Sequence, residues 1–273
     1  MSDLRLVIFD VDGTLVDSQV EIMAAVTVAF DVHGIVMPDR STVLSIVGLS
    51  LDEAFAQLCP DVPDRRTLVE AYKDAFVDLR GADGKGERSV LFPGARDVLD
   101  LFAGQDHTLL AVATGKSRRG LDKMLEKHGL TGMFHSEQVA DHHPSKPNPS
   151  MILTALNETG VAPQKAVMLG DTTFDMDMAR AAGIDVKVIS VPNQATLEIG
   201  AERFYQHLVG ELGVTDFQIN TPFPGGEANE LKPRMPLDVG ELARFHCELA
   251  DIWLERGPDD DVRIGPFDQL LNY

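Results

Sequence analysis

Residues 4–14 read LRLVIFDVDGT, an apolar run that ends in two carboxylates, a glycine and a hydroxyl. The apolar part, Leu4 to Phe9, is typical of a buried parallel strand. Side chains two residues apart on a strand share a face, so Asp10 and Asp12 can reach one site where the strand ends. Gly13 permits a sharp turn there. One such carboxylate can attack phosphorus while the other transfers a proton. A plain strand end followed by an Asx turn is the alternative.

Apolar runs and helical patterns alternate through the rest of the first two thirds of the chain. The runs lie at 108–113, 166–169 and, more weakly, 186–190, and the helical patterns lie at 95–102, 121–128, 150–159 and 174–182. This alternation predicts a parallel sheet with helices on both faces, whose reactive groups gather at the carboxyl ends of the strands. Further helical patterns at 20–33, 51–58 and 65–79 interrupt the alternation after the first strand and predict an inserted lid.

Polar residues follow two of the later strands. Asp171 and Asp175 stand four residues apart at a predicted helix start, so their carboxylates can converge on one Mg²⁺. Helix capping alone would also explain Asp175. Thr114 and Gly115 end the run at 108–113, where a hydroxyl and backbone N–H groups suit a phosphate oxygen. An N-cap threonine is the ordinary alternative for Thr114.

A lysine and two histidines lie in one loop. Lys146 falls within PSKPNP at 144–149, and the prolines would hold its amine in place. A solvated loop lysine is the alternative, and Lys116 competes for the same role, but we favour the lysine framed by prolines. His142 and His143 suggest either a metal site or a polar loop, and the loop composition favours the second.

The composition limits the partners. The 273 residues contain 24 Lys and Arg against 43 Asp and Glu, a formal net charge of −19. This charge argues against nucleic acid or an anionic membrane as a partner, and a phosphorylated substrate would need a bound cation and local positive groups. The sequence holds two distant cysteines and no CxxC motif, signal-peptide pattern or bilayer-length apolar stretch. We therefore expect a cytoplasmic protein, with its oligomeric state left open.

These segments together resemble the haloacid dehalogenase-like superfamily, and within it the phosphoglycolate phosphatase-like group. DVDGT at 10–14 resembles the first motif of that superfamily, Thr114 the second, Lys146 the third and GDTTFD at 170–175 the fourth. The resemblance implies an α/β fold, with a Rossmann-like core over residues 1–14 and 91–191 and a helical C1 cap over 15–90.

The resemblance also implies roles for the residues at the strand ends. In this superfamily the first aspartate, here Asp10, is phosphorylated, and the aspartate two positions on, Asp12, is the acid and base. The threonine and lysine, with the neighbouring glycines, hold the phosphoryl group; here they are Gly13, Thr114, Gly115 and Lys146.

The resemblance further implies a Mg²⁺ site built from Asp10, the backbone carbonyl of Asp12, Asp171 and Asp175, the last binding directly or through water. The implied activity is a Mg²⁺-dependent phosphatase that hydrolyses a small phosphorylated metabolite, such as phosphoglycolate, through an aspartyl-phosphate. Asp12 argues against halide displacement, because dehalogenase members lack an acid there. A phosphomutase of the same superfamily and a non-catalytic protein that binds a phosphorylated ligand remain alternatives. Gly48 is either a cap loop facing the site or a plain turn.

Residues 192–273 depart from the superfamily. They contain helical patterns at 196–212 and 237–256 and a possible strand at 214–220, which predict an atypical C-terminal α/β extension. Segments 217–226 and 265–271 loosely resemble part of a radical-SAM maturase barrel. The CxxxCxxC triad of such proteins is absent, so no iron–sulfur chemistry is implied. We interpret this region as a fused fragment.

Overall fold

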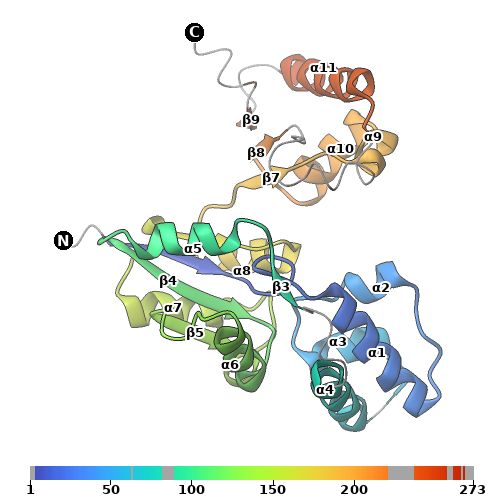
Figure 1. The fold of residues 1–273 in the computed structure, drawn as a ribbon. Coiled ribbons are helices and arrows are strands. Elements are labelled where there is room, and N and C mark those ends of the chain that lie inside the picture. Colours follow the sequence, from blue (N-terminus) through green and yellow to red (C-terminus); the bar gives the residue numbers. More distant parts are fainter. Residues whose placement is uncertain are drawn as a thin grey trace. The chain divides into compact units, whose positions relative to one another are not determined.

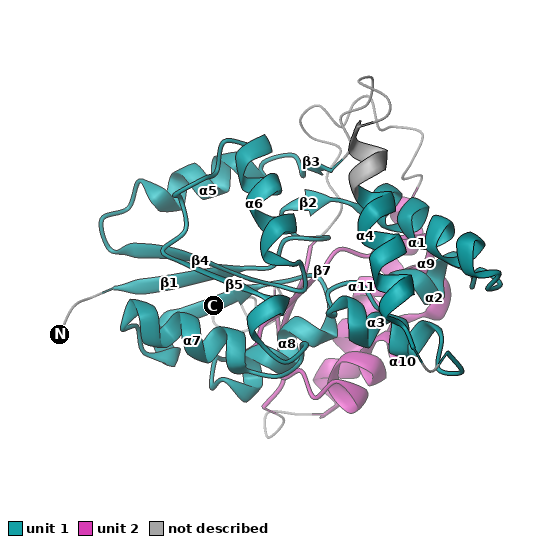
Figure 2. Ribbon diagram, turned by 90° about the horizontal axis from the view of Figure 1, so that it is seen from below, with its two compact units in different colours: residues 1–185 teal, residues 186–273 magenta. Residues whose placement is uncertain are grey.

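The computed structural model describes residues 4–62, 64–81, 89–220, 237–256, 261–265 and 267. The chain divides into two compact units, residues 1–185 and 186–273, which Figure 2 colours separately. The predicted division into core, cap and extension at residues 14, 90 and 191 stays a prediction. No helix among the described residues is long and apolar enough to cross a membrane.

A four-stranded parallel sheet forms the centre of the first unit. Its strands are β1 (Arg5–Phe9), β4 (Thr108–Thr114), β5 (Ser136–Val139) and β6 (Ala166–Leu169), in the order β5-β4-β1-β6. Val7 of β1 lies opposite Leu110 of β4 and Val167 of β6. This register brings the carboxyl ends of β1, β4 and β6 to one edge of the sheet, as the sequence predicts.

Helices cover both faces of this sheet. Helices α5 (Ala95–Ala103) and α6 (Arg118–Lys127) lie on one face, and α7 (Ser150–Thr159) and α8 (Thr173–Ala181) lie on the other (Figure 2). Leu99 of α5 and Leu121 of α6 are fully buried against the sheet residues Phe9 and Leu110. Short 3-10 turns at Ala140–His142 and Pro163–Lys165 lead into the loops before α7 and β6. The predicted α/β architecture is confirmed.

Strand β5 has a polar sequence and was not predicted. Two of its side chains, Ser136 and Gln138, are buried, and both donate hydrogen bonds to Glu158 of α7, at 2.7 Å and 2.8 Å. These bonds satisfy polar groups that would otherwise make burial costly. The burial of this strand therefore depends on hydrogen bonds to a helix later in the sequence, and not on an apolar pattern.

Four helices form the inserted part that the sequence predicts. They are α1 (Gln19–His33), α2 (Arg40–Leu44), α3 (Leu51–Leu58) and α4 (Arg66–Gly81), and Figure 1 shows them beside the sheet edge that carries the strand ends. A two-stranded antiparallel ribbon of β2 (Val16–Asp17) and β3 (Val90–Leu91) connects them to the sheet. Phe55 packs against Phe30 and Tyr72, with ring centroids 6.2 Å and 5.9 Å apart.

The second unit contains its own parallel sheet. Strands β7 (Val188–Ser190), β8 (Asp216–Ile219) and β9 (Arg263–Gly265) pair in that order, and α11 (Val239–Arg256) packs on them through Phe245 and Leu249. The predicted strand at 214–220 and helix at 237–256 are confirmed. The weak run at 186–190 is a strand, but it pairs with β8 and not with β6.

The prediction of one continuous helix over 196–212 is wrong. The segment consists of α9 (Gln194–Ile199), α10 (Ala201–Tyr205) and a π-helical turn (Gln206–Glu211). The interruption falls at Gly200, whose φ of 78° is incompatible with a right-handed helix. Residues 221–226, 266 and 268–271, which carry much of the radical-SAM resemblance, lie outside the described residues.

Candidate active site

Asp10 follows β1 and is almost fully buried. Its backbone N–H donates to the carbonyl of Leu169 at 2.8 Å, which ties the end of β1 to the end of β6. Gly13 has a φ of 87°, and a Cβ there would lie 2.0 Å from Oδ2 of Asp171. Only glycine therefore allows the turn after β1 to lie against the carboxylate that follows β6.

Three carboxylates meet at this edge of the sheet. Oxygen atoms of Asp10, Asp171 and Asp175 all lie within 4.8 Å of one another. Asp175 both caps α8 and belongs to this cluster, so capping alone does not account for its position. Its Oδ2 accepts hydrogen bonds from the N–H and hydroxyl of Thr172 at 3.2 Å and 2.7 Å, which caps α8, while its Oδ1 faces the cluster.

Lys146 joins two of these acids. Its ammonium lies 2.6 Å from Oδ1 of Asp10 and 2.7 Å from Oδ1 of Asp175, and its side chain is fully buried. The alternative of a solvated loop lysine is therefore wrong. Burial raises the pKa of Asp10 to about 7, although the charge of Lys146 opposes this shift.

This cluster fits a divalent cation. Three carboxylates against one ammonium leave two negative charges uncompensated when all are ionised, and Oδ2 of Asp10 is buried with no hydrogen-bond partner among the described residues. A bound cation would stabilise the ionised form of Asp10, whose pKa burial raises. The oxygen donors are of the kind that Mg²⁺ prefers.

Asp12 lies on another side of the site with a second lysine. The ammonium of Lys116 is 2.7 Å from Oδ1 of Asp12 and 5.5 Å from the ring centroid of Phe76, and the hydroxyl of Ser18 also donates to Asp12. The prolines around Lys146 favour it over Lys116 for a single role. The structure brings both lysines to the site, each beside a different aspartate.

Thr114 is fully buried at the end of β4. Its Oγ1 accepts a hydrogen bond from the backbone N–H of Lys116 at 3.2 Å, so it organises the loop before α6. The N-cap of α6 is Ser117, whose hydroxyl accepts from the N–H of Gly120 at 3.2 Å. Capping therefore does not explain Thr114.

The loop around Gly48 lies against the loop that connects β4 to α6. A Cβ on Gly115 would lie 2.5 Å from the carbonyl oxygens of Gly48 and Leu49, and the N–H of Ser50 donates to the hydroxyl of Ser145 at 2.9 Å. Gly48, with a φ of 100°, also lies close to Thr172. Of the two interpretations of Gly48, the loop facing the site is the one that these contacts support.

We expect Gly115→Ala to lower kcat/KM about tenfold or more, because the added methyl would push the Gly48 loop away from the strand ends. The thermal midpoint and kcat/KM of the variant should be compared with those of Gly104→Ala. Gly104 ends α5 in a right-handed conformation, and a methyl there makes only an ordinary contact with the carbonyl of Asp100. Equal kcat/KM in both variants would show that this close approach is unimportant.

The histidines form a structural network. The ring of His143 is hydrogen-bonded through its two nitrogens to Ser150 and Gln138, both at 2.8 Å. Among the described residues, the grouping of acids, histidines and cysteines able to hold a metal comprises Asp10, Asp171 and Asp175, without His142 or His143. The polar-loop interpretation of the histidines is therefore supported.

The sequence profile described as "Haloacid dehalogenase-like hydrolase" matches residues 7–189. The chain belongs to this family. It is 38% identical over 184 residues to "Probable phosphatase IndB" of Dickeya dadantii (strain 3937), a match covering 66% of this chain and 78% of that protein. It is 29% identical over 190 residues to a phosphoglycolate phosphatase of Nitrosococcus oceani, covering 68% of this chain and 84% of that one.

A solved structure supports the same assignment of fold. The crystal structure of a hydrolase from Pseudomonas syringae superposes with a TM-score of 0.62 at 20% identity, covering 85% of this chain and 99% of that one. The predicted superfamily and fold are confirmed. The prediction of a phosphoric monoester hydrolase related to the phosphoglycolate phosphatases is confirmed as well.

Proposed function

We propose that the protein is a Mg²⁺-dependent phosphatase that hydrolyses a small phosphorylated metabolite through an aspartyl-phosphate on Asp10. One observation carries the proposal: the buried carboxylate of Asp10 lies with Asp171 and Asp175 in one cluster, with Lys146 bonded to it. The names of the curated relatives, a probable phosphatase and a phosphoglycolate phosphatase, support the same chemistry.

In the proposed reaction, a carboxylate oxygen of Asp10 attacks phosphorus and the bond to the alcohol oxygen breaks. Asp12 gives a proton to the departing alcohol and then takes one from the water that hydrolyses the acyl phosphate. Thr114 and Lys146 hold the phosphoryl oxygens by hydrogen bonds.

Magnesium would bind at Asp10, Asp171 and Asp175 with the backbone carbonyl of Asp12. When bound, it supplies positive charge that offsets the repulsion between the acids and the phosphate. Positioning by the protein's own residues supports this proposal, because Asp10, Thr114 and Asp171 stand at or just after the ends of β1, β4 and β6, which pair in parallel.

Phosphate release tests the proposal. Purified protein freed of metal with EDTA should release inorganic phosphate from a panel of small phosphomonoesters only after Mg²⁺ is added. Tight binding of these esters without turnover, in the presence of Mg²⁺, would instead favour the non-catalytic alternative. Conversion of a bis-phosphorylated sugar faster than its hydrolysis would favour the phosphomutase.

We expect Mg²⁺ to raise the thermal midpoint of the metal-free protein, because a ligand that binds only the folded state stabilises it by about 2.7 kcal/mol at 100 times its Kd. Asp171→Asn should remove most of this shift. Asp177→Asn is the matched control, since Asp177 lies on α8, is exposed like Asp171, and pairs with Arg180 at 3.2 Å outside the acidic cluster. An unchanged shift in Asp171→Asn would place the cation elsewhere.

A further inference from the structure

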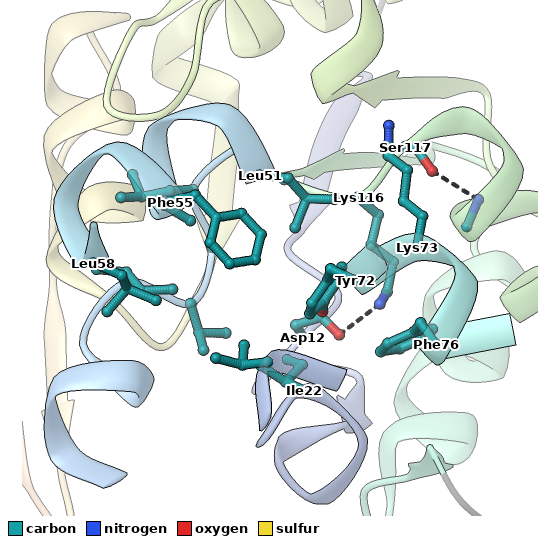
Figure 3. Close-up of a pocket in the computed structure, with 18 of the residues that line it drawn as sticks. Asp12, Ile22, Leu51, Phe55, Leu58, Tyr72, Lys73, Phe76, Lys116 and Ser117 are labelled. Carbon is teal, nitrogen blue, oxygen red and sulfur yellow. Dashed lines mark hydrogen bonds and ion pairs between the residues drawn. The ribbon is translucent and has the colours of Figure 1, made fainter. Parts of the chain in front are cut away.

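A cavity of about 160 Å³ lies between the inserted helices and the loop after β4. Asp12, Gly115, Lys116 and Ser117 line one part of it, so the cavity begins at the residue that would protonate the leaving alcohol. Figure 3 shows Asp12 and its bond to Lys116 within this cavity. Whatever alcohol is attached to the phosphate would therefore extend into this space.

The inserted helices give the cavity an apolar wall. Ile22 from α1, Phe55 and Leu58 from α3, and Tyr72 from α4 line it, and Figure 3 shows Phe55 and Leu58 on the side opposite Lys116 and Ser117. An engineered apolar cavity of about 150 Å³ is known to hold one benzene molecule. The volume and lining of this cavity thus suit an apolar group of about the size of a six-membered ring.

Four further lining residues are basic. They are Lys73, Lys116, Arg119 and Lys123, and among the described residues that line the cavity Asp12 is the only one with a carboxylate. Lys116 pairs with Asp12. Within the described part of the chain, no carboxylate lies within 4.0 Å of the charged nitrogens of Lys73, Arg119 or Lys123. On a chain of net charge −19, three cations beside one cavity that form no ion pair with any described residue point to an anionic ligand.

Building on the proposed function, we propose that the substrate is a phosphate ester of an alcohol that carries both a ring-sized apolar group and an anionic group. The ring would cover Ile22, Phe55 and Leu58, and the anion would lie near Arg119 and Lys123. Glycolate, with two carbons and a carboxylate, would leave this apolar wall bare.

Four phosphate esters of primary alcohols test the proposal: ethyl phosphate, benzyl phosphate, 4-carboxybenzyl phosphate and phosphoglycolate. Burial of the ring should raise kcat/KM for benzyl over ethyl phosphate about tenfold or more. The carboxylate should raise kcat/KM again, and high salt should reduce that second gain because it screens charge. Ethyl phosphate or phosphoglycolate turned over as efficiently as benzyl phosphate would overturn the proposal.

Two variants assign the selectivity to the cavity. Leu58→Ala should lower the ratio of kcat/KM between benzyl and ethyl phosphate, whereas Leu101→Ala, at a position that is 63% exposed on α5, should leave it unchanged. Arg119→Gln should lower the ratio between 4-carboxybenzyl and benzyl phosphate. The exposed Arg40, which does not line the cavity, provides the matched control Arg40→Gln. Unchanged ratios in Leu58→Ala and Arg119→Gln would overturn the assignment.

A binding measurement separates failure of this inference from failure of the proposed function. Benzylphosphonate cannot be hydrolysed, and in the presence of Mg²⁺ it should raise the thermal midpoint more than ethylphosphonate does. Equal shifts would overturn the inference even if all four esters are hydrolysed. A larger shift with benzylphosphonate, together with no hydrolysis of any ester, would support the cavity's preference for an apolar ring. The same result would contradict the proposed phosphatase activity.

Discussion

Asp10→Asn is expected to lower kcat by about 10³-fold or more, because removal of a nucleophile abolishes the covalent route and leaves only the contribution of binding and positioning. Asparagine has nearly the shape of aspartate, so the end of β1 should keep its position between β4 and β6. The buried site should also tolerate the change, since burial already raises the pKa of Asp10 to about 7 and so disfavours its charged form.

Phosphate release at saturating substrate and Mg²⁺ measures this loss. Rapid acid quenching followed by mass spectrometry should find one added phosphoryl group on the peptide that contains Asp10 in the unaltered protein and none in Asp10→Asn. Asp177→Asn makes the same chemical change on the exposed face of α8 and should keep its rate. A full rate in Asp10→Asn would contradict the proposed aspartyl-phosphate.

Most of the site can be predicted from the sequence, since its residues stand directly after apolar runs. The runs at 4–9, 108–113 and 166–169 predict β1, β4 and β6, and parallel strands bring their carboxyl ends to one edge. Asp10 and Asp171 are 161 residues apart in the chain, yet their oxygens lie in one cluster. The alternation of strands and helices is sufficient to predict this meeting.

Other features depend on contacts that the local sequence does not display. Ser136 and Gln138 in β5 lack an apolar pattern, and their burial depends on hydrogen bonds to partners distant in the sequence, such as Glu158 on α7. The run at 186–190 correctly predicts a strand, β7, but a short apolar run does not specify which sheet the strand joins. The ammonium of Lys116 is as close to Oδ1 of Asp12 as that of Lys146 is to Oδ1 of Asp175. The loop that Thr114 organises directs the side chain of Lys116 toward Asp12.

Lys146→Met is expected to be the most destabilising single change at the site. The ammonium of Lys146 lies between Asp10 and Asp175, and all three side chains are almost fully buried. Removing one partner of a buried ion pair leaves uncompensated charge and costs about 3–5 kcal/mol. Urea unfolding of the metal-free protein should show a loss of this order. Lys165→Met, at an exposed position, should cost far less.

A second change distinguishes lost charge compensation from lost packing. Adding Asp10→Asn to Lys146→Met removes one of the two unpaired carboxylates, so the double variant should be more stable than Lys146→Met alone. Saturating Mg²⁺ should also restore part of the stability of Lys146→Met, because the cation would supply charge beside the same acids. If neither addition restores stability, the loss comes from the packing of the lysine stem. In that case Lys146 does not stabilise the protein by compensating the charges of the carboxylates at this edge of the sheet.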